Sequence, residues 1–325
     1  MSDNVVVSAN VGVGATVAAD EIAGVHHQRV KIVLGTDGVS DGDVHEDNPI
    51  PAQVKYLHAS SGLPSSAEGN DGCLHVMDYL SAIGTGHITG HVPFHSIGYN
   101  QDVDAAQEDI CEWGGVYVPP PAGGIQMSVQ SSSAADDGSP AGTGAWTVEI
   151  NYLDASYAEQ TEFVTLNGTT AVNTVATDIL RVNYFHTKTA DITTVGYGQA
   201  VGDITLKNMA GTVTYAQISA GGNFSRHGFF TIPAGKTGYL SGGYVGSGGA
   251  TANKFVRATL RATCDHEGIL SPGIFQFKRM VLVMDSSVNM KYEIPILVPA
   301  TTDIKFSAIG EANSFVSTYV EGWYE

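Results

Sequence analysis

The sequence predicts an all-β protein, an antiparallel β-sandwich of jelly-roll-like form with an extended N-terminal arm and one short helix. Three observations favour this fold class. Short segments that alternate apolar and polar residues recur between turn residues at the spacing of a sandwich. Only 15% of the residues are charged, and 39 are glycine, which suits a turn-rich β protein. No long helical periodicity interrupts the predicted strands.

The clearest strands form a hairpin over residues 146–170. Its first strand alternates Val148, Ile150 and Tyr152 with polar residues, as a half-buried strand does. Residues 154–157 supply a turn with an aspartate at its first position. The chain then returns through a second alternating strand that ends at an Asn-Gly pair. This hairpin predicts an antiparallel sheet.

Further strands are predicted around this hairpin, and together they place one jelly-roll-like sandwich over residues 114–325. No internal repeat is visible, which disfavours a solenoid or a propeller. The additional strands are predicted over residues 125–130, 179–187, 203–207, 213–218, 229–232, 237–244, 254–263, 274–284, 292–296, 302–309 and 315–320.

Residues 1–60 are predicted to form an extended arm with one strand, over residues 28–34. In this strand Val30, Ile32 and Leu34 alternate with their neighbours. A weakly apolar arm with a single strand cannot close a core of its own. We therefore expect the arm to dock on a neighbouring subunit or on the main domain, with these three side chains as its anchors.

Residues 61–113 are predicted to be a connector that contains a short helix over residues 70–83. Four apolar residues of this helix recur at i, i+3, i+4 and i+7, which is the pattern of one buried helix face. Asp71 can cap its first turn, and Gly84 is expected to end it.

Two stretches contain residues that can bind metals, and the first of them is rich in histidine. His87, His91 and His95 recur every four residues, which on a helix would place three imidazoles on one face. Gly90 and Pro93 lie between them and oppose a continuous helix. We therefore expect polar connector residues here rather than a zinc site.

The second stretch is an acidic loop in which Asp37, Asp41 and Asp43 could contribute oxygen ligands to calcium. The spacing does not match the twelve-residue EF-hand loop. A solvated acidic loop is the favoured interpretation, so the sequence predicts no metal and no cofactor. Calcium-dependent stabilisation that is lost in these aspartate variants would reverse that preference.

The net charge and the cysteine content limit the possible binding partners of the protein and its cellular compartment. Fifteen basic and 33 acidic residues give a net charge of −18, which repels phosphate backbones and disfavours nucleic acid. No apolar run reaches the ~18 residues of a membrane helix, and no secretory signal begins the chain. Cys73, Cys111 and Cys264 form no C-x-x-C pair, so we expect small buried thiols in a reducing cytoplasm.

Motifs of known enzyme classes are absent from the sequence. There is no phosphate-binding loop, no G-x-S-x-G and no H-E-x-x-H, so an enzyme is not expected. Four aromatic residues, by contrast, lie in Gly-rich or terminal stretches, where they could bind a glycan or a protein partner. Filling of the core is the favoured alternative for these aromatics, which are Trp113, Tyr117, Trp323 and Tyr324.

Four segments resemble a family of virion structural proteins from tailed bacteriophages, many of them marine. They span residues 20–44, 95–118, 142–186 and 230–240, and the resemblance is most specific over 143–186. The resemblance implies a virion protein that assembles in the host bacterial cytoplasm. It implies the particle and not the position within it. If the protein decorates the capsid, its partners are the major capsid protein and further copies of the chain, expected as a homotrimer at three-fold sites of the lattice. The resemblance brings no catalytic residues.

Three hypotheses follow from this resemblance. The first is a decoration or cement protein on the outside of the capsid, whose acidity suits a surface turned away from packaged DNA. The alternative is a head-fibre or tail-associated receptor-binding protein that recognises host glycans. The third, a carbohydrate-active enzyme on a jelly roll, is disfavoured because no pair of acids can be placed across a sugar.

Overall fold

The computed structural model divides the chain into two compact units, Met1–Thr89 and Gly90–Glu325. Within the part of the chain that the structure describes, the strands form five antiparallel sheets and are accompanied by one short helix. This confirms the predicted all-β, sandwich-like fold class. The residues described are 79–194, 197–249, 254–311 and 313–325, together with the backbone of 3–7, 15–22 and 25–28.

The first unit contains a small antiparallel sheet of order β1-β2-β3, formed by Asp3–Val7, Ala15–Ile22 and Val25–Gln28. The sequence predicted a single strand for this arm, and that strand, beyond Gln28, lies outside the described residues. Helix α2 (Tyr79–Gly84) ends at Gly84 as predicted. The predicted start of this helix lies outside the described residues as well.

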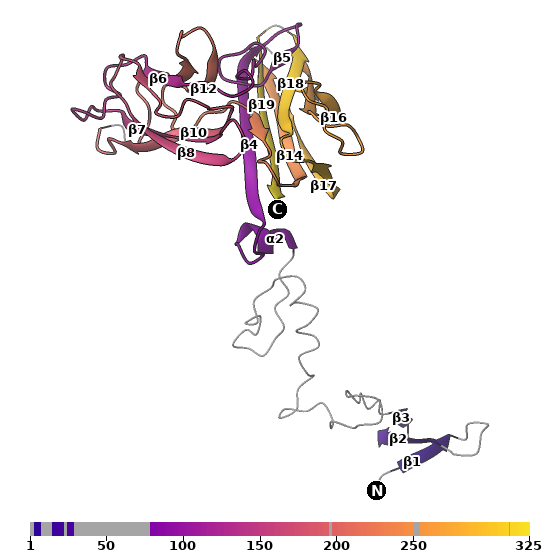
Figure 1. Ribbon diagram of the computed structural model, residues 1–325. Helices are drawn as coiled ribbons and strands as arrows, with labels where there is room; N and C mark the ends of the chain where they lie inside the picture. Colours follow the sequence, from indigo (N-terminus) through magenta and orange to yellow (C-terminus); the bar gives the residue numbers. More distant parts are fainter. Residues whose placement is uncertain are drawn as a thin grey trace. The chain divides into compact units, whose positions relative to one another are not determined.

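The second unit contains an eight-stranded jelly roll (Figure 1). One sheet has the order β13-β18-β15-β16, with β5 paired to β18, and the other has the order β17-β14-β19-β4. Each sheet thus mixes early and late strands, which is the double Greek-key order of a jelly roll. The eight jelly-roll strands are β4 (Val92–Val103), β13 (Phe229–Thr231), β14 (Gly238–Gly249), β15 (Phe255–Ala262), β16 (Gln276–Met284), β17 (Ser287–Val298), β18 (Asp303–Gly310) and β19 (Ser314–Tyr324), and the additional two-residue strand is β5 (Glu108–Asp109).

An inserted lobe, residues 125–225, leaves the jelly roll between β5 and β13 and forms a second sandwich beside it (Figure 1). Its sheets have the orders β10-β7-β8 and β12-β11-β6-β9. The strands are β6 (Met127–Ser131), β7 (Ala145–Leu153), β8 (Glu159–Thr165), β9 (Val172–Asn173), β10 (Arg181–Ala190), β11 (Ile204–Asn208) and β12 (Thr214–Ile218).

The predicted hairpin is confirmed as β7–β8. Val148 pairs with Val164 and both are buried, while the exposed Phe163 points away from them, as strict alternation requires. Asp154 starts the turn by accepting hydrogen bonds from the backbone N–H of Ser156 and of Ala158, at 2.8 and 3.0 Å. The hydrogen bond from the Ser156 side chain is the largest cause of a lowered pKa of Asp154, and the backbone hydrogen bonds lower it as well.

Two expectations about organisation were wrong. Residues 114–325 contain two hydrophobic cores rather than one, because the inserted lobe closes its own core. Residues 92–103, expected in the connector, form the jelly-roll strand β4, which pairs with β19. The buried face of β4 carries Ser96, Gly98 and Asn100 besides Phe94, so apolar alternation does not reveal it.

Candidate functional site

The first set of predicted site residues falls outside the described part of the chain. These residues are the arm anchors Val30, Ile32 and Leu34 and the loop aspartates Asp37, Asp41 and Asp43. Their roles stay predictions. Among the residues that are described, no three His, Cys, Asp or Glu side chains gather to hold a metal ion. Within the same residues, no helix has the length and apolar character to span a bilayer.

The histidine repeat does not form one helical face. His91 pairs with Glu325 at 2.7 Å, and His95 lies on β4 with its ring 6.0 Å from Tyr319. Desolvation lowers the pKa of His95 against an opposing effect of Glu321. His91 therefore lies next to the start of the edge strand β4, and His95 belongs to the aromatic surface of the same sheet.

The four predicted aromatics divide into two pairs. Trp323 and Tyr324 are each only 5% exposed, because β19 lies between β14 and β4, and the Trp323 ring stacks on Tyr239. The favoured interpretation, filling of the core, therefore holds for these two rings, and the alternative of an open stacking surface does not. Trp113 and Tyr117 are half-buried, and the Tyr117 ring lies 3.9 Å from that of Phe229.

The loop before the inserted lobe is anchored by a buried ion pair. The Lys305 ammonium lies 2.8 Å from Asp109, and both side chains are almost fully buried. Asp109 also accepts hydrogen bonds from Ser307 Oγ at 2.7 Å and from the Tyr117 backbone N–H at 2.8 Å. A buried charge pair with its remaining lone pairs satisfied holds this loop against β18.

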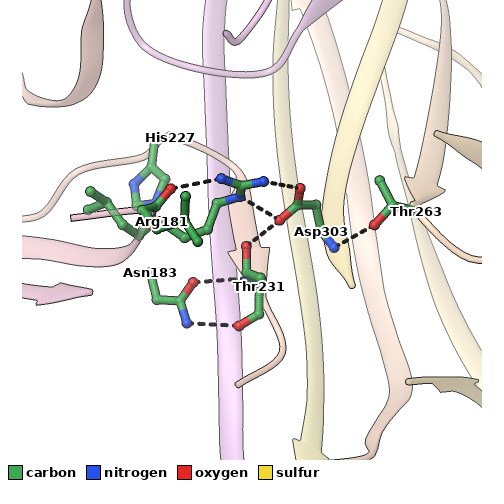
Figure 2. Close-up of polar contacts among 8 residues, drawn as sticks. Arg181, Asn183, His227, Thr231, Thr263 and Asp303 are labelled. Carbon is green, nitrogen blue, oxygen red and sulfur yellow. Dashed lines mark hydrogen bonds and ion pairs between the residues drawn. The ribbon is translucent and has the colours of Figure 1, made fainter. Parts of the chain in front are cut away.

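A second set of polar contacts joins the inserted lobe to the jelly roll. Figure 2 shows Arg181 of β10 reaching Asp303 of β18 through two hydrogen bonds, at 2.8 and 2.9 Å. Burial alone would lower the pKa of the Arg181 guanidinium, but the hydrogen bonds and charge of Asp303 outweigh it, and the pKa is raised. The Asn183 side chain exchanges two hydrogen bonds with the backbone of Thr231.

His227 completes this junction as a neutral buried side chain. Its Nε2 lies 3.2 Å from the Val182 carbonyl, which can only accept, so Nε2 carries the proton and Nδ1 accepts from Ser225 Oγ. Burial lowers the pKa of His227 to about 4. The junction thus fixes the orientation of the two lobes without depending on a charged imidazole.

A cleft of about 260 Å³ opens beside the junction, between strands of both lobes. Its apolar part includes Phe94 and Phe230, whose rings stack at 4.2 Å, and Tyr324 close to both. Its polar part lies on β7 and β8 of the inserted lobe. The Tyr324 hydroxyl crosses the cleft and donates to Glu159 Oε1 at 2.5 Å.

The outer face of β15–β16 gathers several exposed apolar side chains of the jelly roll. The register pairs Phe255 with Met284, Arg257 with Leu282, Thr259 with Met280 and Arg261 with Phe277. Cross-strand partners share a face of the sheet, so these side chains form one surface. Its apolar members, exposed by 43–71%, are Phe255, Phe277, Met280, Leu282 and Met284.

Sequence reasoning predicted β15 and β16 but missed this face. One signal was available, because residues 280–284 are five consecutive apolar residues. Such a run is typical of a strand that is covered on both faces. The cleft gave no comparable signal, since its lining comes from strands that are far apart in the sequence.

Comparisons with known proteins do not identify the chain. No protein-family model matches it, and no curated protein matches it. A crystal structure of the infectious bursal disease virus VP2 subviral particle aligns with 72% of this chain and 76% of that one, at 10% identity. The TM-score of 0.16 is too low for this likeness to support any conclusion about fold or function.

Proposed function

We propose that this chain is a virion structural protein of a tailed bacteriophage, a decoration or cement protein that stabilises the head through protein–protein contacts. Copies of it associate through the outer face of β15–β16. The resemblance of four sequence segments supports the virion role, and the exposed apolar face supports assembly. A jelly roll by itself is compatible with capsid and lectin roles alike and does not choose between them.

The composition of the face is that of a protein interface. Phenylalanine, methionine and arginine are enriched at the centres of such interfaces, and here Arg257 and Arg261 flank the apolar side chains. Burying the exposed half of each of the five apolar side chains would contribute about 1 kcal/mol apiece. Their sum of about 5 kcal/mol is large enough to offset part of the cost of association.

The occupant that we propose for this face is a second copy of the chain. Residues 254–284, which span β15 and β16, carry five basic and two acidic residues, which leaves ten basic and 31 acidic residues for the rest of the chain. The face is therefore locally positive, whereas the remainder of the same protein is strongly acidic. Face-to-face contact would oppose like charges, so a head-to-tail contact is favoured, which closes into a ring such as a trimer.

The test is the oligomeric state of the full chain, measured by light scattering after size exclusion. Leu282→Asp places a charge in the centre of the face and should yield a monomer with an unchanged β-sheet circular dichroism spectrum. Ile192→Asp is the matched control, because Ile192 is 72% exposed on the inserted lobe. A monomeric wild-type protein, or a Leu282→Asp variant that still assembles, would contradict self-association through this face.

The position in the virion is tested separately by immunogold labelling of intact particles. We expect label over the head, and binding of the purified chain to undecorated heads that is lost when residues 2–34, with the arm anchors, are deleted. Label confined to the tail tip would favour the alternative, a receptor-binding protein that recognises host glycans. The observation that favours this alternative is the cleft between the two lobes.

A further inference from the structure

The cleft beside Tyr324 has the polarity of a site for a hydroxyl-rich ligand. Its polar wall on β7 and β8 includes the carboxylate of Glu159, the amides of Asn151 and Gln160 and the hydroxyl of Thr161, and the rest of the lining adds the hydroxyls of Tyr152, Tyr184 and Tyr324 and the amide of Asn183. Within the described chain, Glu159 accepts at Oε1 from Tyr324, while its Oε2 accepts no protein hydrogen bond. The amides of Asn151 and Gln160 donate through nitrogen to protein partners, which leaves their oxygens as acceptors.

This excess of acceptors selects among ligand classes. A sugar offers several O–H donors in a fixed arrangement, which complements carboxylate and amide oxygens. None of the described lining residues is Lys, Arg or His, and Glu159 contributes an acidic group, so an anionic ligand is disfavoured. The Phe94 and Phe230 rings stack face to face on each other, so these faces are not free to surround a quaternary ammonium.

The size and the rigidity of the cleft fit a single sugar residue. A volume of about 260 Å³ lies just below the ~300–1,000 Å³ typical of drug-sized ligands. One wall comes from each lobe, and the Arg181–Asp303 and Asn183–Thr231 hydrogen bonds hold the lobes together beside it. Because the walls are already held in place, ligand binding needs to order few protein groups, and this lowers the cost of binding.

The same lining argues for binding without hydrolysis. Glu159 is the only acidic residue among the described residues that line the cleft. Glycosidases place two carboxyl groups on either side of the scissile bond, about 5–9.5 Å apart. A single carboxylate that accepts a hydrogen bond from Tyr324 is suited to hold a sugar hydroxyl.

We infer that the cleft between the two lobes is a binding site for one neutral sugar residue, with Glu159 and Asn151 as acceptors and the Phe94–Phe230–Tyr324 cluster as its apolar wall. This site is independent of the β15–β16 face. It would allow a head-bound protein to contact cell-surface or environmental polysaccharide as well.

The experiment is saturation-transfer difference NMR on the full chain, with methyl glycosides of glucose, galactose, mannose and N-acetylglucosamine as probes and choline as a cationic comparator. We expect transfer to at least one methyl glycoside. Glu159→Gln should weaken that binding at least tenfold, and Thr161→Trp, which fills the rim from an edge strand, should abolish it. Glu267→Gln, an exposed glutamate outside the cleft, is the matched control and should bind like wild type.

Each other outcome overturns the assignment. Transfer to none of the glycosides removes the sugar site, and transfer to choline alone indicates a cation site instead. Glycoside binding that persists in both cleft variants places the sugar elsewhere on the protein. Because Leu282→Asp leaves the cleft untouched, it should bind the glycoside normally, so failure of the assembly proposal and failure of the sugar site can be told apart.

Discussion

Removing the carboxylate of Asp303 should show how strongly the two lobes are held together. In Asp303→Ala the Arg181 guanidinium keeps its charge but loses both hydrogen bonds to β18, and Thr231 Oγ1 loses its acceptor at 2.7 Å. Arg181 can still donate to the Leu180 carbonyl at 2.8 Å, so it remains positioned at the junction (Figure 2). The variant therefore leaves an unpaired cation between the lobes.

The magnitude follows from the burial of the pair. The two side chains are 12% and 18% exposed, which makes the ion pair largely buried. Removal of one partner of a buried pair costs about 3–5 kcal/mol, and the residual exposure favours the lower end, about 3 kcal/mol. Arg181→Met in the same chain removes the unpaired cation. We therefore expect the double variant to be about 2 kcal/mol more stable than the sum of the single changes predicts.

The assay is urea denaturation of the wild type, the two single variants and the double variant, followed by circular dichroism. The Lys188–Glu149 pair provides the control cycle, because Lys188 is half exposed and such pairs contribute about 0.2–1 kcal/mol. A coupling energy for Arg181 and Asp303 no larger than that of the control would refute the idea that this pair locks the lobes.

Two further predictions concern buried ionisable groups. The pKa of folded His227 is about 4 and an unfolded histidine titrates near 6.5, so stability should fall as the pH drops below 6.5, by about 1 kcal/mol at pH 5.5. Urea midpoints at pH 7.5 and 5.5 should show this loss in wild type but not in His227→Gln, and an equal loss in both would contradict it. Asp109→Ala leaves the Lys305 ammonium buried without its carboxylate and should cost about 3–5 kcal/mol in urea. Asp109→Leu combined with Lys305→Met should recover most of that cost, and a double variant as unstable as Asp109→Ala would be the contrary result.

The hairpin β7–β8 could be predicted because all of its determinants are local. Val148 and Ile150 recur with a period of two and are fully buried, and Asp154 starts the turn through its own side chain. A one-residue slip of this strand would move its apolar face to solvent, so the pattern also fixes the register. Neighbouring residues carry enough information for such an element.

Strand β4 could not be predicted in the same way, because its determinants are distant. Its partner β19 lies more than 200 residues further along the chain, with Val92 opposite Tyr324. Gly98 on its buried face is required by packing rather than by hydrophobicity, since a Cβ there would lie 2.5 Å from Thr318 Oγ1 and 2.6 Å from the Ile110 carbonyl. The cleft could not be predicted from the sequence for the same reason, because β4 and β19 form part of its wall.

The edge strand β16 carries the features on which the assembly proposal rests. Soluble β proteins protect edge strands with charges or bulges. In β16 the charges Lys278 and Arg279 and the bulge opposite Leu260 all lie at one end, while the other end carries Met280, Leu282 and Met284 half exposed. An unprotected apolar edge either binds a partner of defined geometry or aggregates without limit. A head-to-tail contact that closes into a ring stops at a fixed number of copies, whereas one that does not close grows into a filament. Light scattering at increasing protein concentration distinguishes these outcomes: a plateau at a small whole number of copies supports assembly through this face, and unbounded growth that Leu282→Asp suppresses shows an aggregation-prone edge instead.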